Sequence, residues 1–343
     1  MDLGPAGRMA VVPGSSSAET LRAGASPVIT VEHLRKAYGT TVAVDDISFS
    51  VRRGEIFGVL GRNGAGKTTT VECISGLRVP DAGEVRVLGL EPRQDREELH
   101  QRLGVQLQQG ALPPKLKVGE AVQLYGSFYD RPADAARLLE RLGLQAKRGS
   151  YWRTLSGGQK QRLSIALALI GQPEVAVLDE LTTGLDPEAR RETWDLIEGV
   201  RDSGVTIVLV THFMDEAERL CDRVALIDQG KLIALGQPAQ VAAQAATAKR
   251  VQLRAPGQHG EQVLRAVPEV SAVEHHGPDI VVAGSGNLVT AIVLALDRAG
   301  LVAEDVRTET GNLEDAFLAL TSRAEQGKAG AGAGGSAAEP AGP

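Results

Sequence analysis

The residues with the most specific chemistry form a phosphate-loop pattern, G-x-x-x-x-G-K-[ST], at residues 61–68. The apolar run Ile56–Leu60 before it predicts a buried strand, and the proline-free stretch after Lys67 predicts a helix. In that context the loop N–H groups and the helix N-terminus bind phosphate, the lysine contacts the β- and γ-phosphates, and Thr68 holds Mg²⁺. A nucleoside triphosphate site is therefore predicted. Its loop residues are Gly61, Asn63, Gly64, Ala65, Gly66, Lys67, Thr68 and Thr69.

A second group of candidate residues follows another predicted strand, Val175–Leu178. Asp179, directly after it, is placed to bind the Mg²⁺ that a phosphate-loop enzyme needs. Glu180 could polarise the attacking water as a general base. Each feature has a plainer reading: two acids at a strand end also fit a solvated turn, and a chain with 40 glycines can match the loop pattern by chance. The flanking strands and helix favour the nucleotide site.

The composition fits a globular chain with a core. Its 343 residues suggest about two domains, and 43% hydrophobic with 23% charged residues is ordinary for a soluble protein. A formal net charge of −6 gives no bulk attraction to nucleic acid. Cys73 and Cys221 lack metal or disulfide-framework spacing, and no apolar run is long enough to span a bilayer. We expect a cytosolic chain, or one held at a membrane only through a partner.

Strands alternate with helices from Val28 to a strand at Thr206–Val210, which predicts a parallel α/β core with ligands at the carboxyl ends of strands. Beyond Gly236 the predicted order is βαββαβ, the ferredoxin-like α+β pattern. The predicted divisions are a disordered tail (1–27), a phosphate-loop domain (28–238), a linker (239–249), an accessory domain (250–323) ending in the amphipathic segment Leu313–Leu320, and a disordered tail (324–343).

The segment Leu155-Ser156-Gly157-Gly158-Gln159 resembles the signature of ATP-binding cassette (ABC) ATPases, and other motifs follow in that family's order. Tyr38 matches the adenine-stacking aromatic, Gln108 the Q-loop glutamine, Gly184-Leu185-Asp186 the D-loop, and His212 the switch histidine. The resemblance covers roughly residues 28–238. It implies an ABC cassette fold, with a RecA-like core, an antiparallel β subdomain and a helical subdomain.

The family also implies roles for these residues in the binding and hydrolysis of ATP with Mg²⁺. The catalytic set would be Lys67, Gln108, Glu180 and His212. The magnesium ligands would be Thr68, Gln108 and Asp179. The nucleotide-binding residues outside the phosphate loop would be Tyr38, Ser156, Gly157, Gly158, Gln159 and Asp186.

The family implies a head-to-tail dimer, either a homodimer or a pseudo-symmetric pair, with ATP between one chain's phosphate loop and the other chain's signature. The residues agree, because Ser156 and the glycines behind it open a helix whose N–H groups form a second anion site. A chain with one loop and one signature can complete a closed site only by pairing. Ser156 is also placed to cap its helix.

Some positions keep an alternative reading or depart from the family pattern. His212 could pack rather than contact the γ-phosphate, and Tyr38 could be a turn tyrosine that packs locally. Many relatives have proline where this chain has Arg62 and Leu181. Neither change removes a reacting group, but Leu181 frees a backbone φ that proline would fix, so the sequence does not define the D-loop geometry.

The segments Gly311–Leu318 (GNLEDAFL) and Glu180–Pro187 (ELTTGLDP) resemble ATPase subunits of type-2 ABC exporters, the daunorubicin-resistance-like group. That resemblance implies a separate integral-membrane permease, export of a drug, lipid or glycan, and a location at the cytoplasmic face of the cell membrane. We expect the contact with the permease near Leu112 to Val118, an apolar, proline-containing stretch that would be partly exposed.

The alternative is a soluble ABC ATPase that acts on ribosomes or DNA. Translation-type members usually carry two cassettes in one chain, whereas this chain has one. DNA-repair members have long coiled-coil or zinc insertions, for which the interval between Gln108 and Ser156 leaves no space. The acidic balance also disfavours nucleic acid as a partner.

Overall fold

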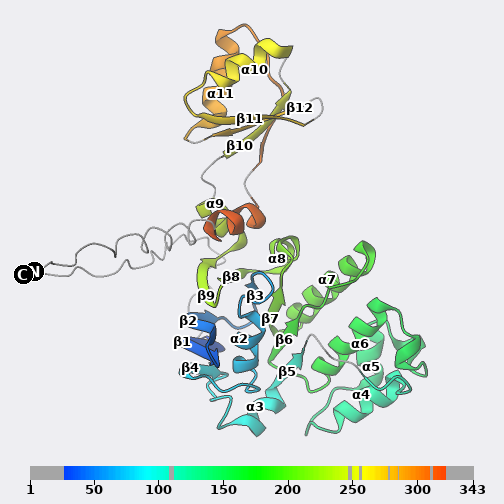
Figure 1. Ribbon diagram of the computed structural model, residues 1–343. Coiled ribbons are helices and arrows are strands. Elements are labelled where there is room, and N and C mark those ends of the chain that lie inside the picture. Colours follow the sequence, from blue (N-terminus) through cyan, green and yellow to red (C-terminus); the bar gives the residue numbers. More distant parts are fainter. Residues whose placement is uncertain are drawn as a thin grey trace, which may run out of the picture.

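The computed structural model describes residues 27–107, 112–245, 249–254, 257–276, 279–284, 286–309 and 312–321. Within these residues the strands form three sheets, of six, three and four strands (Figure 1). None of the helices found there combines the length and the apolar character that crossing a bilayer requires.

The six-stranded sheet carries the predicted phosphate loop. Its strand order is β5-β6-β7-β3-β8-β9, with β9 antiparallel to β8 and the other pairs parallel. β3, β6 and β7 are buried along their whole length, which explains their apolar sequences because both faces of a parallel sheet are covered. The strands are β3 (Ile56–Leu60), β5 (Leu103–Gln106), β6 (Val175–Asp179), β7 (Thr206–Thr211), β8 (Arg223–Asp228) and β9 (Lys231–Gly236).

The two faces of this sheet build two different cores. Phe57 and Val59 of β3 join α2 and the three-stranded sheet on one face. Ile56 and Leu60 join α6, α7 and α8 on the other, as the alternation of side chains along a strand requires. The helices of these two cores are α2 (Lys67–Ile74), α6 (Gly157–Leu169), α7 (Pro187–Asp202) and α8 (Met214–Leu220).

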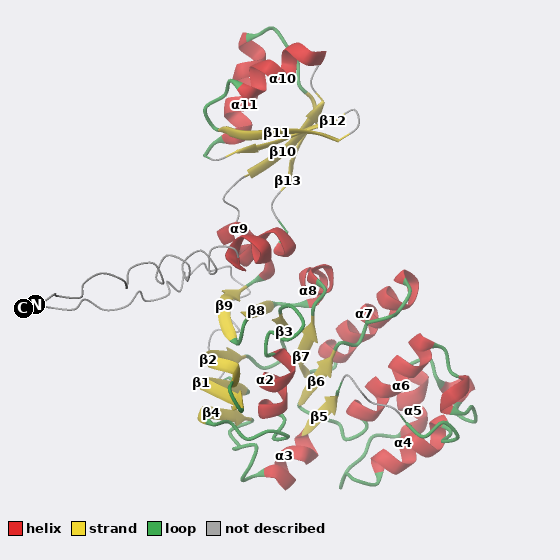
Figure 2. Ribbon diagram, in the orientation of Figure 1, coloured by secondary structure: helices red, strands yellow, loops and turns green. Residues whose placement is uncertain are grey.

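The two predicted subdomains flank the six-stranded sheet and complete the cassette fold. The three-stranded sheet, in the order β2-β1-β4, is antiparallel throughout. The helical subdomain groups α4, α5 and α6 (Figure 2). The remaining elements are β1 (Ile29–Tyr38), β2 (Thr41–Val51), β4 (Ala82–Val87), α3 (Arg96–Arg102), α4 (Val118–Gly126) and α5 (Ala135–Arg141).

The four-stranded sheet has the order β11-β12-β10-β13, with antiparallel neighbours, which confirms the ferredoxin-like topology. α10 and α11 pack against it around a core of its own that includes Val251, Leu264 and Ile292. The elements of this part are α9 (Pro238–Ala245), β10 (Lys249–Arg254), α10 (Gly257–Arg265), β11 (Val270–His276), β12 (Asp279–Gly284), α11 (Leu288–Arg298) and β13 (Glu304–Glu309).

Residues 313–321 form a further helix, called the C-terminal helix below. The sequence predicts that this segment belongs to the accessory domain. Leu313 and Phe317 instead belong to the large core that contains α6, α7 and α8, and the Leu313 N–H donates to Glu218 Oε1 on α8. An amphipathic period predicts one buried face but does not identify the surface that buries it.

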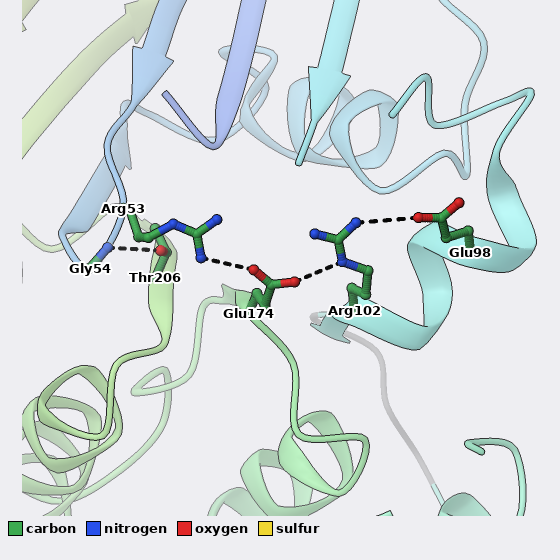
Figure 3. Close-up of polar contacts among 6 residues, drawn as sticks. All are labelled: Arg53, Gly54, Glu98, Arg102, Glu174 and Thr206. Carbon is green, nitrogen blue, oxygen red and sulfur yellow. Dashed lines mark hydrogen bonds and ion pairs between the residues drawn. The ribbon is translucent and has the colours of Figure 1, made fainter. Parts of the chain in front are cut away.

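Glu174, directly before β6, connects the loop before β3 with α3 through two arginine side chains (Figure 3). Its carboxylate accepts hydrogen bonds from Arg53 Nη1 at 2.8 Å and Arg102 Nε at 2.7 Å, and Arg102 Nη1 lies 3.4 Å from Glu98 Oε1. The Gly54 N–H donates to Thr206 Oγ1 at 2.9 Å. The network thereby ties the loop before β3 to α3. The Arg53 and Arg102 guanidinium groups lower the pKa of Glu174.

Glu174→Gln should therefore destabilise the fold in a pH-dependent way. Because the Glu174 side chain is 37% exposed, screening limits the loss to about 0.5–1 kcal/mol at pH 7. The pKa of Glu174 in the folded state is lowered from 4.5. The variant's loss in free energy of unfolding is therefore fully present above pH 4.5, and it shrinks as the pH falls through the folded-state pKa. Urea unfolding at pH 7, 5 and 4 measures this. Glu84→Gln, which removes an exposed ion pair with Arg86, is the control. A difference that does not change with pH would contradict the assignment.

Candidate active site

The phosphate loop connects β3 to α2, and its glycines are required by close backbone contacts. Gly61 and Gly66 have positive φ angles of 153° and 102°. A Cβ at Gly61 would lie 2.1 Å from the carbonyl oxygen of Ile227, and one at Gly66 would lie 2.3 Å from that of Ala43. Any other residue would clash with the backbone at both positions. β8 and β2 therefore hold the loop from outside.

Lys67 starts α2 with its side chain turned into the loop. Its Nζ donates to the carbonyl oxygens of Gly61 at 2.9 Å and Arg62 at 3.1 Å, and the residue is 5% exposed. Burial lowers the pKa of Lys67, whereas the carboxyl groups of Glu180 and Asp179 act to raise it. The ammonium group thus lies inside the loop and within the electrostatic reach of both predicted acids.

The acids lie where β6 ends, beside the end of β7. Asp179 is the last residue of β6 and is 1% exposed. Glu180 follows with a φ of 49°, and His212 Nδ1, just after β7, lies 3.2 Å from Glu180 Oε1. Positive φ at a non-glycine residue is costly, and such strain concentrates at functional sites. Because β3, β6 and β7 are neighbours and parallel, their carboxyl ends bring the loop, the acids and the histidine to one edge.

The donor set at this edge suits magnesium. Mg²⁺ prefers oxygen ligands and is usually bound by one or two carboxylates together with substrate phosphates. The buried Asp179 carboxyl and the exposed Thr68 hydroxyl in the first turn of α2 are donors of that kind. In the part of the chain that the structure describes, no group of three or more His, Cys, Asp or Glu residues could hold a metal without such a substrate.

For two further sequence-predicted residues the assigned roles stay predictions. Gln108 is outside the described residues, so its role as Q-loop glutamine stays a prediction. Tyr38 ends β1 and is 42% exposed, with Lys36 Nζ and Arg78 Cζ at 5.7 Å and 5.8 Å from its ring centroid. These cation–π contacts fit the alternative of local packing, and adenine stacking also stays a prediction.

The signature residues open α6, which lies apart from α2 in the helical subdomain (Figure 1). Ser156 Oγ accepts from the Gln159 N–H at 3.3 Å, and Gln159 Oε1 accepts from the Ser156 N–H at 3.1 Å. This reciprocal capping box confirms the predicted N-cap role of Ser156. Ser156 and Gly157 are exposed, so the start of α6 faces outward from the chain.

The D-loop, whose geometry the sequence left open, is a turn that leads into α7. Leu181 is fully buried, and the Leu185 N–H donates to the Thr182 carbonyl oxygen at 3.2 Å. Asp186 Oδ1 caps α7 by accepting the N–H groups of residues 188 and 189 at 3.1 Å and 2.9 Å. The structure thus gives Asp186 a structural contact, and its predicted nucleotide role stays a prediction.

A cavity of about 570 Å³ lies at the mouth of the phosphate loop. Residues 61–63 and 212–215 line one part of it, and Glu314, Phe317 and Leu318 of the C-terminal helix line another. Arg62 Cζ lies 5.5 Å from the centre of the Phe317 ring, which gives this departure from the family pattern a contact within the chain. None of the described lining residues comes from the signature.

Two residues at this edge were missed by the sequence analysis. Gln106 Oε1 accepts the Asp179 N–H at 3.1 Å, so this side chain helps to fix the end of β6. Glu216 on α8 is fully buried, and its Oε1 accepts from Trp194 Nε1 at 3.1 Å. For Gln106 the available signal was a polar residue at the end of an apolar segment, but its partner is distant in sequence. Glu216 lies in the charged segment Met214–Leu220, where no local pattern marks it as buried.

Comparison with known proteins places this chain in a family. An ABC transporter family profile matches residues 44–183. Over 318 residues the chain is 40% identical to Nod factor export ATP-binding protein I of Ralstonia nicotianae, which covers 88% of this chain and 95% of that protein. The chain belongs to the ABC transporter ATP-binding proteins. Proteins of this family are ATPases whose ATP hydrolysis is coupled to transport, and this chain is such a subunit.

Other ATP-binding proteins are also similar to this ABC transporter subunit. It is 37% identical to the daunorubicin resistance ATP-binding protein DrrA3 of Streptomyces coeruleorubidus, over 87% of this chain and 96% of that one. It is 33% identical to the linearmycin resistance ATP-binding protein LnrL of Bacillus subtilis, over 86% and 99%. A solved ATP binding subunit of an ABC transporter has a TM-score of 0.58 and 28% identity, and the match covers 63% of this chain and 92% of that one.

Substitutions at Glu180 and at Lys67 should have different effects on ATP hydrolysis and ATP binding. If Glu180 is the general base, Glu180→Gln keeps the shape of the side chain but removes the base, so ATP hydrolysis should fall by about 10²–10⁴-fold while ATP binding persists. Lys67→Ala removes the cation inside the loop, so ATP should bind weakly. Phosphate release and equilibrium binding of a fluorescent ATP analogue measure the two effects, with Glu140→Gln on the exposed face of α5 as the control. Normal hydrolysis by Glu180→Gln would exclude Glu180 as the base.

Proposed function

We propose that this chain is the motor subunit of a type-2 ABC exporter that moves a drug, lipid or glycan. Similarity over nearly the full length of ATP-binding proteins named for Nod factor export, linearmycin resistance and daunorubicin resistance supports this most directly, because the match includes the accessory part. The chain would act on a separate integral-membrane permease and would lie at the cytoplasmic face of the cell membrane.

In the proposed reaction, the residues at the sheet edge bind ATP and activate water. Lys67 neutralises the β- and γ-phosphates from inside the loop, and the α2 N-terminus adds positive potential. Glu180 accepts a proton from the attacking water at a carboxylate oxygen, while His212, 3.2 Å away, holds that carboxylate in place. Bound Mg²⁺, held by Asp179 and Thr68 and by Gln108 if the resemblance is followed, would neutralise charge on the phosphates.

We further propose that two copies enclose each ATP. The phosphate loop and the signature of one chain lie at separate places, and the exposed start of α6 presents a helix N-terminus that favours an anion. A second copy placed head-to-tail would bring its Ser156, Gly157 and Gly158 to the open side of the loop. Hydrolysis would then separate the copies, and that motion would be passed to the permease.

The surface proposed for the permease is a groove of about 990 Å³ between α3 and the end of α4. It is lined by apolar Leu77 and Phe128, which are 44% and 63% exposed, together with Glu97 and Arg102 of α3. Exposed apolar residues that gather in a groove mark a protein contact. The Glu174 network described above fixes α3, and thereby one wall of this groove.

The sequence alone predicts the permease contact at residues 112–118 instead. In the structure Val118 is fully buried, and Leu112 and Leu116 are half-buried against the core, so that expectation of exposure was wrong for Val118. Apolar side chains that pack against the core are less available for contact with a partner.

The double variant Leu77→Ser/Phe128→Ser should weaken the permease contact without impairing the ATPase of the purified subunit. Affinity purification from detergent-solubilised membranes should recover a multi-span membrane protein with the wild type and at least about tenfold less with the variant, a loss equal to 1.4 kcal/mol. Leu124→Ser, which changes a 48% exposed leucine of α4 outside the groove, is the matched control. Recovery of ribosomes or DNA instead of a membrane protein would favour the soluble alternative.

A further inference from the structure

The buried carboxyl of Glu216 lies between the two segments that carry the reacting side chains. It is 0% exposed and projects from α8, which follows directly after His212 and Phe213. The hydroxyl groups of Thr182 and Thr211 lie close enough to act on its pKa, as does the charge of Arg190. Thr182 is two residues after Glu180, and Thr211 is one residue before His212. One carboxyl therefore lies against both catalytic segments.

The third contact of this carboxyl is with α7, the helix that the D-loop leads into. Trp194 Nε1 donates to Glu216 Oε1 at 3.1 Å, whereas Glu216 Oε2 and Thr182 Oγ1 make no hydrogen bond of good geometry. Burial is the largest influence and raises the pKa of Glu216, and the two threonine hydroxyls only partly offset it. A buried acid held by three different segments is costly unless those segments are fixed around it.

Arg190 gives α7 a further contact with the segment that follows His212. Arg190 of α7 stacks over the Phe213 ring with its Cζ 4.4 Å from the ring centroid, and its Nη1 lies 3.3 Å from Asp215 Oδ2. Thr211 Oγ1 accepts the Phe213 N–H at 3.0 Å, which fixes the turn around His212. The buried carboxyl and Arg190 thus both connect α7 with the segment that follows β7.

We propose that Glu216 is a positioning residue for hydrolysis, which holds the turn carrying Glu180 and the strand end carrying His212 in one rigid unit. The proposal rests on the function assigned above to Glu180. By packing beside Thr182 and Thr211 and bonding to Trp194, Glu216 maintains the 3.2 Å contact between His212 Nδ1 and Glu180 Oε1. Among the described residues, no hydrogen bond or ion pair joins Glu216 to the phosphate loop, so its loss should disturb hydrolysis rather than ATP binding.

The first test is a double-mutant cycle in the purified full-length chain. Glu216→Ala should lower kcat by about 10- to 100-fold, because a small misplacement of reacting groups costs that much, while ATP binds within about threefold of wild type. In a Glu180→Gln background, Glu216→Ala should cause no further loss, since its effect passes through Glu180. Glu216→Gln, which keeps the shape and an acceptor for Trp194, should restore most of the rate.

Milder variants keep the proposal testable if Glu216→Ala does not fold. Thr182→Val removes one hydroxyl next to the carboxyl and should lower kcat by about tenfold, equivalent to 1.36 kcal/mol. Thr193→Val makes the same change at a buried threonine of α7 that bonds to the Ala189 carbonyl oxygen, and it should leave kcat within about twofold. Thermal unfolding of each variant separates lost activity from lost stability.

The outcomes separate this inference from the assignment of the site. If Glu180→Gln leaves hydrolysis unchanged, the catalytic assignment itself fails. If Glu180→Gln abolishes hydrolysis but Thr182→Val and Glu216→Ala keep the wild-type kcat, the positioning role is wrong while the assignment stands. An equal loss from Glu216→Ala in the wild-type and Glu180→Gln backgrounds would likewise show that Glu216 acts only on general stability.

Discussion

The contact on which the site depends is the close approach of the phosphate loop to two carbonyl oxygens from other strands. Only glycine fits at Gly61 and Gly66, because Ile227 and Ala43 occupy the space of a side chain. The β8 end and the start of β2 thus shape the loop, and the loop in turn buries the Lys67 ammonium. Without both supports the loop N–H groups would not be held in position around a phosphate.

Around that loop, the order of strands decides which side chains meet. β3 lies beside β7, and β7 beside β6, so Lys67, Glu180 and His212 come together although they are distant in sequence. The signature is excluded from this edge because α6 belongs to the helical subdomain. α8 connects α7 with the C-terminal helix, since Glu216 accepts a hydrogen bond from Trp194 and Glu218 accepts the N–H of Leu313.

Local patterns predicted much of this arrangement. The apolar runs of β3, β6 and β7 and the glycine loop identified the core, and the βαββαβ order identified the ferredoxin-like topology. The hairpin of β8 and β9 was not assigned, although Gln229 and Gly230 at its turn adopt the paired positive φ angles of 47° and 77° that such turns use. α3 was also missed, since it is short and has one buried residue, Leu99.

The sequence did not predict side-chain contacts between residues that are far apart in the chain. The pairing of Gln106 with the Asp179 N–H spans 73 residues, and that of Trp194 with Glu216 spans 22. No periodicity encodes such contacts, because they depend on how whole elements pack. The docking of the C-terminal helix beside Arg62 has the same origin: its apolar face was evident, and the surface that buries it was not.

The central claim is that each ATP is enclosed by the loop of one chain and the signature of another, and mixing two inactive variants tests it most directly. Lys67→Ala disables the loop, and Ser156→Arg fills the anion site at the start of α6. In a mixed dimer, one site combines the intact loop of the Ser156→Arg chain with the intact signature of the Lys67→Ala chain. We predict that each variant alone is inactive and that mixing them restores ATP hydrolysis. No recovery in mixed dimers, or full activity of Ser156→Arg alone, would contradict a site shared between two chains.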